Sequence, residues 1–243
     1  MKTLLRSTAI LSLGLLASGA MAQDIVRIGT EGAYAPYNFV NDQNQLDGYE
    51  IELGNELCLR AGLTCEWVQN DWDSIIPNLV SGNYDAIMAG MSITDERRQV
   101  IAFSDEYVPA QSSLYVAQTE GVDVNTAVVA AQTGTIQAGH VSETAATLLE
   151  FATFDDALAA VTSGEADAVL ADGDSLLPAI EASGGALVVV DSVQIGGGIG
   201  VGLRQSDTAL AETFNTAIAS MKADGTINEL MVKWFGAEAE TFE

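Results

Sequence analysis

The chain has 243 residues, a formal net charge of −25 and a hydrophobic share of 48%. So strong a negative charge argues against nucleic acid and against an anionic membrane surface as partners. Because the acidic residues are scattered and hydrophobic residues are plentiful, the composition predicts a folded protein with a buried core rather than a disordered chain.

The first residues have the pattern of a cleaved secretory signal. Two basic residues, Lys2 and Arg6, precede a short apolar stretch at residues 9–16, and small residues follow. This order predicts a signal peptide over residues 1–22, and the apolar stretch is too short to span a bilayer. We therefore expect a mature protein that begins at Gln23, lies in the periplasm and carries a charge of about −27, because the leader removes two of the basic residues.

The cysteine content is limited to Cys58 and Cys65, which lie close together in the sequence. In an exported chain such a pair predicts a disulfide bond. Metal binding is the weaker alternative, because the chain has a single histidine, His140, and no further cysteine. We expect neither a metal nor a cofactor.

The first half of the mature chain alternates between strand and helix patterns. Short apolar runs predict strands at residues 25–29, 64–69 and 86–88, and helical patterns lie between them at residues 50–60 and 71–80. Gly62 is placed to end the first of these helices. The alternation predicts an α/β fold with mostly parallel strand pairing.

The stretch after the strand at residues 86–88 has the features of an anion site. Ala89 and Gly90 are small enough to let a ligand approach the backbone. Ser92 adds a hydroxyl, and Thr94 is a predicted helix N-cap. Arg97 falls in the first turn of that helix, where the macrodipole disfavours a cation by up to about 1 kcal/mol. A guanidinium held beside a helix N-terminus suits a small carboxylate.

Arg97 also has a second interpretation. Asp95 and Glu96 are close to it in the sequence, so the three side chains could pair on the surface. In that case Arg97 has no role in binding. The sequence of this segment leaves both interpretations open.

The second half repeats the α/β pattern. We expect strands at residues 127–131, 168–172 and 187–190, helices at residues 154–163, 209–221 and 227–234, and extended segments at residues 107–117 and 196–203. Residues 132–136 predict a second strand-to-helix turn. Asp172 ends one of the strands, and ligands of open α/β sheets bind at such ends. The alternative is that Asp172 caps the following helix.

A weak internal echo indicates two related halves. Residues 81–87 resemble residues 163–169, and each stretch predicts a helix end, a tight turn and a buried strand that leads to a polar group. Two lobes that each contribute one strand end to a shared cleft would explain the echo. The alternative is that α/β proteins commonly repeat such turns.

Taken in order, several motifs resemble a known family. They are Thr30 to Tyr37, Gly48 to Leu53, Asp85 to Arg97, Phe103 to Asp105, Ala166 to Asp172 and Met221 to Thr226. Together they resemble the periplasmic solute-binding proteins of polar amino-acid ABC transporters, which form family 3 of the bacterial extracellular solute-binding proteins. The resemblance implies a two-lobed fold of the type II periplasmic-binding-protein class, in which two crossing strands join lobes that close on an amino acid.

The resemblance also implies domain boundaries and partners. Lobe 1 is expected over residues 23–110 and 203–243, and lobe 2, with the crossing strands at its ends, over residues 111–202. The implied partner is the membrane permease of an ABC transporter, and the protein is expected to be a monomer.

Carried over by position, the resemblance assigns ligand-binding roles. Arg97, aided by Ser92, would bind the α-carboxylate of the amino acid, and Asp172 would bind its α-ammonium. Tyr34 and Trp72 would pack on the aliphatic part of the ligand. Backbone groups around Gly90, Thr135 and Ile136 would complete the site. The chain departs from the basic-amino-acid binders at Ala89 and Gly90, where they usually carry serine, and at Ile136, where threonine is frequent.

The choice of amino acid depends on two acidic residues. Glu31 and Glu50 match positions that face the cationic side chain in lysine-, arginine-, ornithine- and histidine-binding relatives, a branch in which the bridge between Cys58 and Cys65 also recurs. They favour a cationic ligand, although residues 90–94 and Gln132 also resemble glutamine-binding relatives. Alternatively, Glu31 is a surface charge and Glu50 a first-turn helix acid.

Two other functions fit the same fold. An enzyme similar to cyclohexadienyl dehydratase could use Asp172 as an acid or base. However, no nucleophile–base pair is evident, and we expect a binding protein rather than an enzyme. A soluble receptor that passes its ligand to a membrane sensor is the other alternative.

Overall fold

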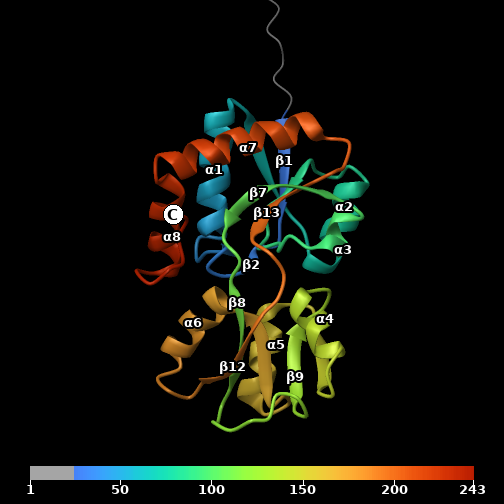
Figure 1. The fold of residues 1–243 in the computed structure, drawn as a ribbon, viewed down its shortest axis with the longest axis vertical. Helices are drawn as coiled ribbons and strands as arrows, with labels where there is room; N and C mark the ends of the chain where they lie inside the picture. Colours follow the sequence, from blue (N-terminus) through green and yellow to red (C-terminus); the bar gives the residue numbers. More distant parts are fainter. Residues whose placement is uncertain (1–24) are drawn as a thin grey trace, which may run out of the picture.

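The computed structural model describes residues 25–243, so the predicted signal peptide and Gln23 lie outside the described residues. Two lobes lie one above the other in Figure 1, and two chain segments connect them. Each lobe contains a five-stranded mixed sheet flanked by helices. The predicted α/β class and two-lobed architecture are confirmed.

The sheet of the first lobe has the strand order β5-β1-β6-β13-β7. Strand β1 (Ile25–Thr30) is parallel to β5 (Thr64–Gln69) and β6 (Ala86–Ile87), whereas β13 (Ile199–Leu203) is antiparallel to β6 and β7 (Ala102–Val108). The other elements of this lobe are α1 (Tyr49–Ala61), a 3-10 turn (Trp72–Ser74), α2 (Ile75–Val80), α3 (Asp95–Arg98), α7 (Thr208–Ala223), α8 (Thr226–Phe235) and a small antiparallel sheet of β2 (Ala33–Tyr34), β3 (Asn38–Val40) and β4 (Leu46–Asp47).

The sheet of the second lobe has the order β10-β9-β11-β8-β12. Strand β9 (Val128–Gln132) is parallel to β10 (Thr147–Phe151) and β11 (Ala168–Asp172), whereas β8 (Ser112–Ala117) is antiparallel to β11 and β12 (Val188–Gln194). Its helices are α4 (Ile136–Ser142), α5 (Phe154–Ser163) and α6 (Gly173–Ala182).

The chain passes between the lobes at residues 109–111 and 195–198. The extended segment predicted at residues 107–117 therefore consists of the end of β7 in one sheet and β8 in the other. Strand β13 pairs with β6 and β7, so the chain re-enters the first sheet at Ile199, ahead of the boundary that we expected at residue 203.

Local signals explain most of the element boundaries. Gly62 and Gly164 end α1 and α5 in the left-handed conformation, with φ of 66° and 81°, which glycine adopts without steric cost. Thr94 and Thr135 accept hydrogen bonds from backbone N–H groups at the starts of α3 and α4. The sequence did not predict β10, whose residues are only partly buried and lack a long apolar run. Within residues 25–243, no helix is both long and apolar enough to cross a membrane.

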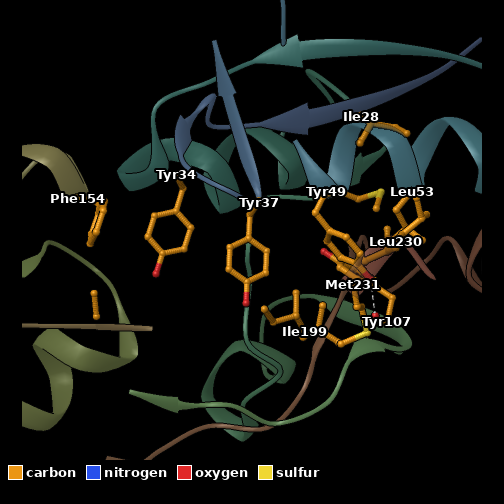
Figure 2. Packing of buried hydrophobic residues seen from close by; sticks show 14 of the residues in the cluster. Ile28, Tyr34, Tyr37, Tyr49, Leu53, Tyr107, Phe154, Ile199, Leu230 and Met231 are labelled. Carbon is orange, nitrogen blue, oxygen red and sulfur yellow. Dashed lines mark hydrogen bonds between the residues drawn. The ribbon is translucent and has the colours of Figure 1, made fainter. Parts of the chain in front are cut away.

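A row of aromatic rings lies in the core of the first lobe, next to the cleft. Figure 2 shows Tyr34, Tyr37, Tyr49 and Tyr107 in this row, with Phe154 of the second lobe opposite Tyr34. The Tyr34 and Tyr37 rings stack with centroids 5.7 Å apart, and Phe154 meets Tyr34 edge-on at 5.4 Å. The hydroxyl of Tyr49 donates to the carbonyl oxygen of Tyr107 at 2.8 Å. The core therefore reaches the cleft and continues across it.

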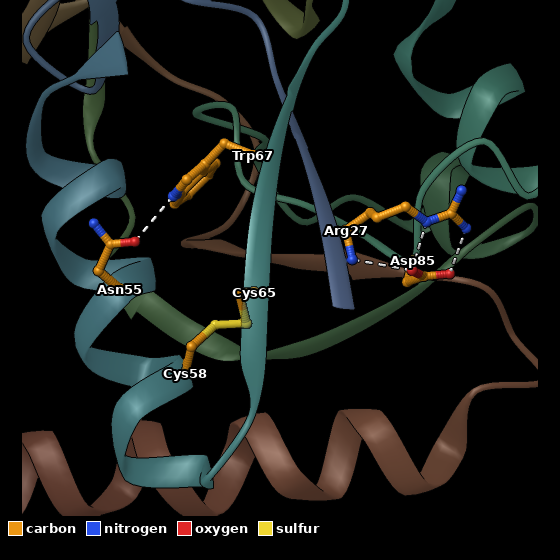
Figure 3. Close-up of a disulfide and its surroundings, with 6 residues drawn as sticks. All are labelled: Arg27, Asn55, Cys58, Cys65, Trp67 and Asp85. Carbon is orange, nitrogen blue, oxygen red and sulfur yellow. Dashed lines mark hydrogen bonds and ion pairs between the residues drawn. A yellow bond between two sulfur atoms is a disulfide. The ribbon is translucent and has the colours of Figure 1, made fainter. Parts of the chain in front are cut away.

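The disulfide joins α1 to β5. Figure 3 shows Cys58 on the helix and Cys65 on the strand beside it, with their Cα atoms 6.2 Å apart. The predicted pairing is confirmed. The same view shows Asp85, which precedes β6, bound to the guanidinium and backbone N–H of Arg27 in β1.

Candidate functional site

A cavity with about 300 Å³ of empty space lies between the two lobes. All of the predicted binding residues except Glu50 line it: Glu31, Tyr34, Trp72, Gly90, Ser92, Arg97, Thr135, Ile136 and Asp172. Ala89, Gln132 and Gln137 complete the lining. A concave site with a few convergent charged groups is typical of small-molecule binding.

The Arg97 guanidinium belongs to the wall formed by the first lobe. The hydroxyl of Thr94 accepts the backbone N–H of Arg97 at 3.1 Å, which fixes the start of α3. The guanidinium donates to the carbonyl oxygen of Ser92 at 2.8 Å and lies 5.2 Å from the centroid of the Trp72 ring. It also reaches the second lobe, since Nη2 lies 3.4 Å from the carbonyl oxygen of Gly134.

The structure decides between the two interpretations of Arg97. In the described part of the chain, Arg97 forms no salt bridge with Asp95 or Glu96. Burial lowers the pKa of Arg97 to about 10, and the negative charges of Asp172 and Glu96 oppose that change. The guanidinium therefore remains charged at neutral pH and is directed to the cavity instead of to a surface pair.

Asp172 stands on the opposite wall, at the carboxyl end of β11. Its Oδ2 accepts the hydroxyl of Tyr34 at 2.6 Å, and its Oδ1 accepts Nε2 of Gln137 at 2.7 Å. Asp172 occupies the N-cap position of α6, but its side chain makes no capping hydrogen bond there and faces the cavity instead. Burial raises the pKa of Asp172, whereas Tyr34, Arg97 and Gln137 stabilise its ionised form.

Glu31 supplies a second carboxylate to the cavity. It is only 5% exposed, so it is not the surface charge that one interpretation of the sequence allowed. Its Oε1 accepts Nε2 of Gln132 at 2.6 Å, and the same amide nitrogen donates to the carbonyl oxygen of Ala152 at 3.0 Å. Burial raises the pKa of Glu31 to about 7, and the nearby acidic residues Asp71 and Asp155 act in the same direction.

Glu50 lies behind the cavity wall, outside the lining where its predicted role would place it. Its side chain is fully buried, and its Oε1 accepts the backbone N–H of Gly90 at 2.8 Å. That N–H is therefore bonded within the lobe, although backbone groups around Gly90 were expected to face the ligand. Similarly, the hydroxyl of Thr135 caps α4 and donates to the carbonyl oxygen of Gln132 at 2.7 Å.

Sequence reasoning missed two polar residues of this region. Gln137 orients Asp172 and also donates to the hydroxyl oxygen of Ser113 at 3.0 Å. Its place one turn after β9, in the first turn of a helix that begins at the cleft, is a signal that could have identified it. Asp174 accepts the hydroxyl of Tyr37 across the lobes at 3.1 Å and does not line the cavity.

The bacterial extracellular solute-binding protein family 3 model matches residues 26–237. The chain belongs to this family. The lysine/arginine/ornithine-binding periplasmic protein of Escherichia coli (strain K12) is 32% identical to it, and the alignment covers 96% of each chain.

Solved structures agree with this membership. A periplasmic His/Glu/Gln/Arg/opine family-binding protein from Silicibacter pomeroyi, crystallised with lysine, shares 61% identity and a TM-score of 0.87 over 89% of this chain and all of that one. An ancestral amino acid-binding protein described as a precursor of cyclohexadienyl dehydratase shares 32% identity and a TM-score of 0.80, over 87% of this chain and 95% of its own. The relatives of this family-3 chain are thus amino-acid-binding proteins, and the fold has also been a starting point for an enzyme.

The geometry of this family-3 site suits a small zwitterion. One guanidinium faces one carboxylate across a cavity whose walls come from different lobes, and a further carboxylate lies beside them. Among the described residues, no cluster of His, Cys, Asp and Glu side chains could hold a metal ion. His140 lines a neighbouring groove and not the cavity.

Proposed function

We propose that this protein binds one L-amino acid with a cationic side chain in the cleft between its lobes. The observation that carries the proposal is that Arg97 from the first lobe and Asp172 from the second line the same cavity. An α-amino acid carries one carboxylate and one ammonium on neighbouring atoms, so it can bind both groups at once. Because the two anchors belong to different lobes, the ligand stabilises the closed arrangement by contacts that an open one lacks.

The charge of the cavity favours a cationic side chain. The basic and acidic side chains of its lining are one guanidinium, Arg97, and two carboxylates, Asp172 and Glu31. The main-chain groups of an amino acid use Arg97 and Asp172, which leaves Glu31 for the ligand side chain. A lysine-like or arginine-like ligand brings the positive charge that this buried carboxylate otherwise lacks. The lysine complex of the relative with 61% identity supports the assignment.

The ring planes of Tyr34 and Trp72 would hold the aliphatic part of such a ligand. Both side chains line the cavity and are less than 10% exposed, at 8% and 9%. Ser92, Ile136 and the backbone at Gly90 and Thr135 complete the enclosure. The long methylene chain of lysine or arginine gains from burial beside aromatic rings while its charged end reaches Glu31.

We further propose that the protein is a periplasmic, monomeric binding protein that delivers the amino acid to the membrane permease of an ABC transporter and catalyses no reaction. The names of its relatives support this role, since they include binding proteins of the periplasm and an ABC transporter arginine-binding protein. We assign residues 25–110 and 199–243 to the first lobe and residues 111–198 to the second, and the pairing of β13 with β6 and β7 from Ile199 onward supports this division.

A ligand screen tests the proposal. We expect lysine, arginine and ornithine to raise the melting temperature most in a thermal-shift screen of the twenty amino acids plus ornithine, because a ligand that binds only the folded state stabilises it. Calorimetry should then show that Glu31→Gln weakens arginine by roughly 10- to 100-fold and glutamine far less. Equal losses for both ligands would refute the cationic assignment, and turnover of a prephenate-like substrate would favour the dehydratase alternative.

A further inference from the structure

Glu50 combines complete burial with a full set of neutral hydrogen-bond donors. Its carboxylate accepts the backbone N–H of Gly90 at 2.8 Å, the hydroxyl of Tyr107, and Nδ2 of Asn38 at 2.7 Å. Within the described residues it forms no salt bridge. Burial raises the pKa of Glu50, and these three hydrogen bonds oppose the rise. Since all three partners donate, they match an ionised carboxylate, which has acceptor sites only.

The three donors belong to separate parts of the first lobe. Gly90 lines the cavity between β6 and α3, and Asn38 lies on β3. Tyr107 lies on β7, directly before the chain crosses to the second lobe. One buried carboxylate therefore joins the cavity wall, the small sheet and the beginning of a crossing segment.

Asn38 extends this connection to the loop that carries Glu31. Its Oδ1 accepts the backbone N–H of Gly32 at 2.7 Å while its Nδ2 donates to Glu50. Gly32 directly follows Glu31 in the chain. The position of the Glu31 backbone is thus linked to Glu50 through a single amide side chain.

Gly90 has a conformation that needs such support. Its φ of 61° is in the left-handed region, and a Cβ atom at this position would lie 3.1 Å from Cδ1 of Tyr34. Glycine alone fits between the Tyr34 ring and the wall. Because glycine is also the most freely rotating residue, the hydrogen bond to Glu50 fixes which way this peptide faces.

We propose that Glu50 is a positioning residue that holds Gly90 directly and Glu31 through Asn38 and Gly32, and that it does not itself contact the ligand. This inference takes the identity of the ligand from the proposed function, whereas the hydrogen bonds of Glu50 are observed in the structure. A residue with this role should support the binding of every amino acid through Gly90, and the binding of cationic ligands additionally through Glu31. A residue that binds or attracts the cationic side chain should instead support cationic ligands selectively.

The carboxylate is required because an amide of the same shape cannot replace it. Glutamine at this position has one acceptor oxygen and one NH₂ donor, so one of the three donors around it would face another donor. Asn38 cannot turn its amide to compensate without giving up the N–H of Gly32. We therefore expect Glu50→Gln to release either Gly90 or the Gly32 loop.

The test compares Glu50→Gln with Glu31→Gln. Calorimetry below the melting temperature should show that Glu50→Gln weakens the binding of both ligands, glutamine by about tenfold, which is the effect of one hydrogen bond to a charged group, and arginine by more, because Glu31 is displaced as well. The backbone amide NMR signals of Gly90 or Gly32 should shift in the ligand-free protein. Glu31→Gln is the matched control, since it removes a carboxylate of the same size and should discriminate between the two ligands.

Each other outcome overturns the proposal. A loss confined to arginine would show that binding does not depend on the bond between Glu50 and Gly90, and a lower melting temperature with unchanged affinities and amide signals would make Glu50 purely structural. If Glu50→Gln fails to fold, Asn38→Ser tests the branch to Gly32 alone, and its loss of affinity should be larger for arginine than for glutamine, because this branch positions Glu31. If the wild-type protein binds no amino acid, the proposed function fails, while the amide signals still decide the role of Glu50.

Discussion

The two lobes are built on one plan and differ at the cleft. Their sheets, β5-β1-β6-β13-β7 and β10-β9-β11-β8-β12, have the same plan: three parallel strands, then one antiparallel strand, then a fifth strand antiparallel to the fourth. Residues 81–87 and 163–169 occupy matching positions in them. The weak echo in the sequence therefore reflects a repeated turn in the structure.

The repeated turn matches in its hydrogen bonds. Asp85 and Asp167 each donate a backbone N–H to the neighbouring first strand, at Arg27 and Val128, both at 2.8 Å. The side-chain carboxylates of the same two aspartates accept hydrogen bonds from the first strands, from the N–H of Arg27 at 3.0 Å and from that of Val128 at 2.8 Å. Each aspartate thus aligns two parallel strands that end at the cleft.

Beyond these strands the lobes diverge. In the first lobe β6 leads through Gly90 and Ser92 to the guanidinium of Arg97, whereas in the second β11 ends at the carboxylate of Asp172. One scaffold therefore presents a guanidinium and a carboxylate to the same cavity, which under the proposed function form an anion-binding wall and a cation-binding wall. The fold sets where the site lies, and the few residues after each strand decide what it recognises.

Removal of the anion-binding wall should have the largest effect. We expect Arg97→Ala to lower the affinity for every amino acid by at least about 100-fold, because the ligand carboxylate would be buried without a partner. Arg98→Ala is the matched control: its guanidinium lies 5.8 Å from the Phe103 ring and does not line the cavity. Calorimetry with arginine and glutamine measures both variants, and similar affinities for the two variants would contradict the assignment.

Removal of the charge on the cation-binding wall should have a somewhat smaller effect. Asp172→Asn keeps the shape of the side chain and loses the charge that would pair with the α-ammonium, so we expect about a 30-fold or greater loss for all amino acids. Asp174→Asn tests a carboxylate on the same lobe that contacts Tyr37 outside the cavity lining. The affinity of the Asp174→Asn variant should stay within a few-fold of wild type. A loss as large as that of Asp172→Asn would contradict the claim that only Asp172 faces the ligand.

The pH dependence of binding should distinguish the contribution of Glu31 to affinity from those of Arg97 and Asp172. Its pKa of about 7 means that it gains its negative charge between about pH 5.5 and 8. Arginine affinity should therefore rise over this interval, by up to roughly 30-fold, because only the ionised fraction pairs with the ligand cation. Glutamine is the internal control, since Arg97 and Asp172 serve both ligands.

Ionisation of Glu31 should have the opposite effect on the stability of the ligand-free protein. Burial raises the pKa of Glu31 above its usual 4.5, so the ligand-free protein loses stability as the pH rises through about 7. Arginine should offset this loss and should raise the melting temperature more at pH 8 than at pH 5.5. A rise that does not depend on pH, or one that persists in Glu31→Gln, would be incompatible with this role for Glu31.

The sequence predicted the charged anchors because each has a local signal. Arg97 is a cation in the first turn of a helix, and Asp172 follows an apolar strand, so neighbouring residues alone indicate both. The position of Glu50 had no such local signal. The partners of Glu50 lie 12, 40 and 57 residues away, and a first-turn glutamate has the same local pattern whether or not its partners bury it. The sequence also did not indicate that the chain re-enters the first lobe at Ile199, because a glycine-rich strand has the same sequence pattern whichever sheet it joins.

The matching aspartates provide the smallest and most direct test of the repeated plan. Asp85 forms salt bridges of 3.1 Å with both Arg27 and Arg204, whereas Asp167 bonds to a backbone N–H. We expect Asp85→Asn to lower the free energy of unfolding by about 1–2 kcal/mol and Asp167→Asn by about 0.5–1 kcal/mol, since partial exposure weakens the ion pairs. Arginine affinity should be unchanged in both, because neither residue lines the cavity.

Acid should remove the difference between these two variants. Burial acts to raise the pKa of Asp85, but hydrogen bonds from Arg27 and Arg204 outweigh it and hold the pKa below its usual 3.8. The stability that Asp85 contributes is therefore present above pH 3.8 and is lost as the pH falls through the lowered value. Urea unfolding at pH 7 and near pH 3 measures this change. If Asp85→Asn were as costly in acid as at neutral pH, its hydrogen bonds and not its charge would explain why this aspartate stands where Asp167 stands in the other lobe.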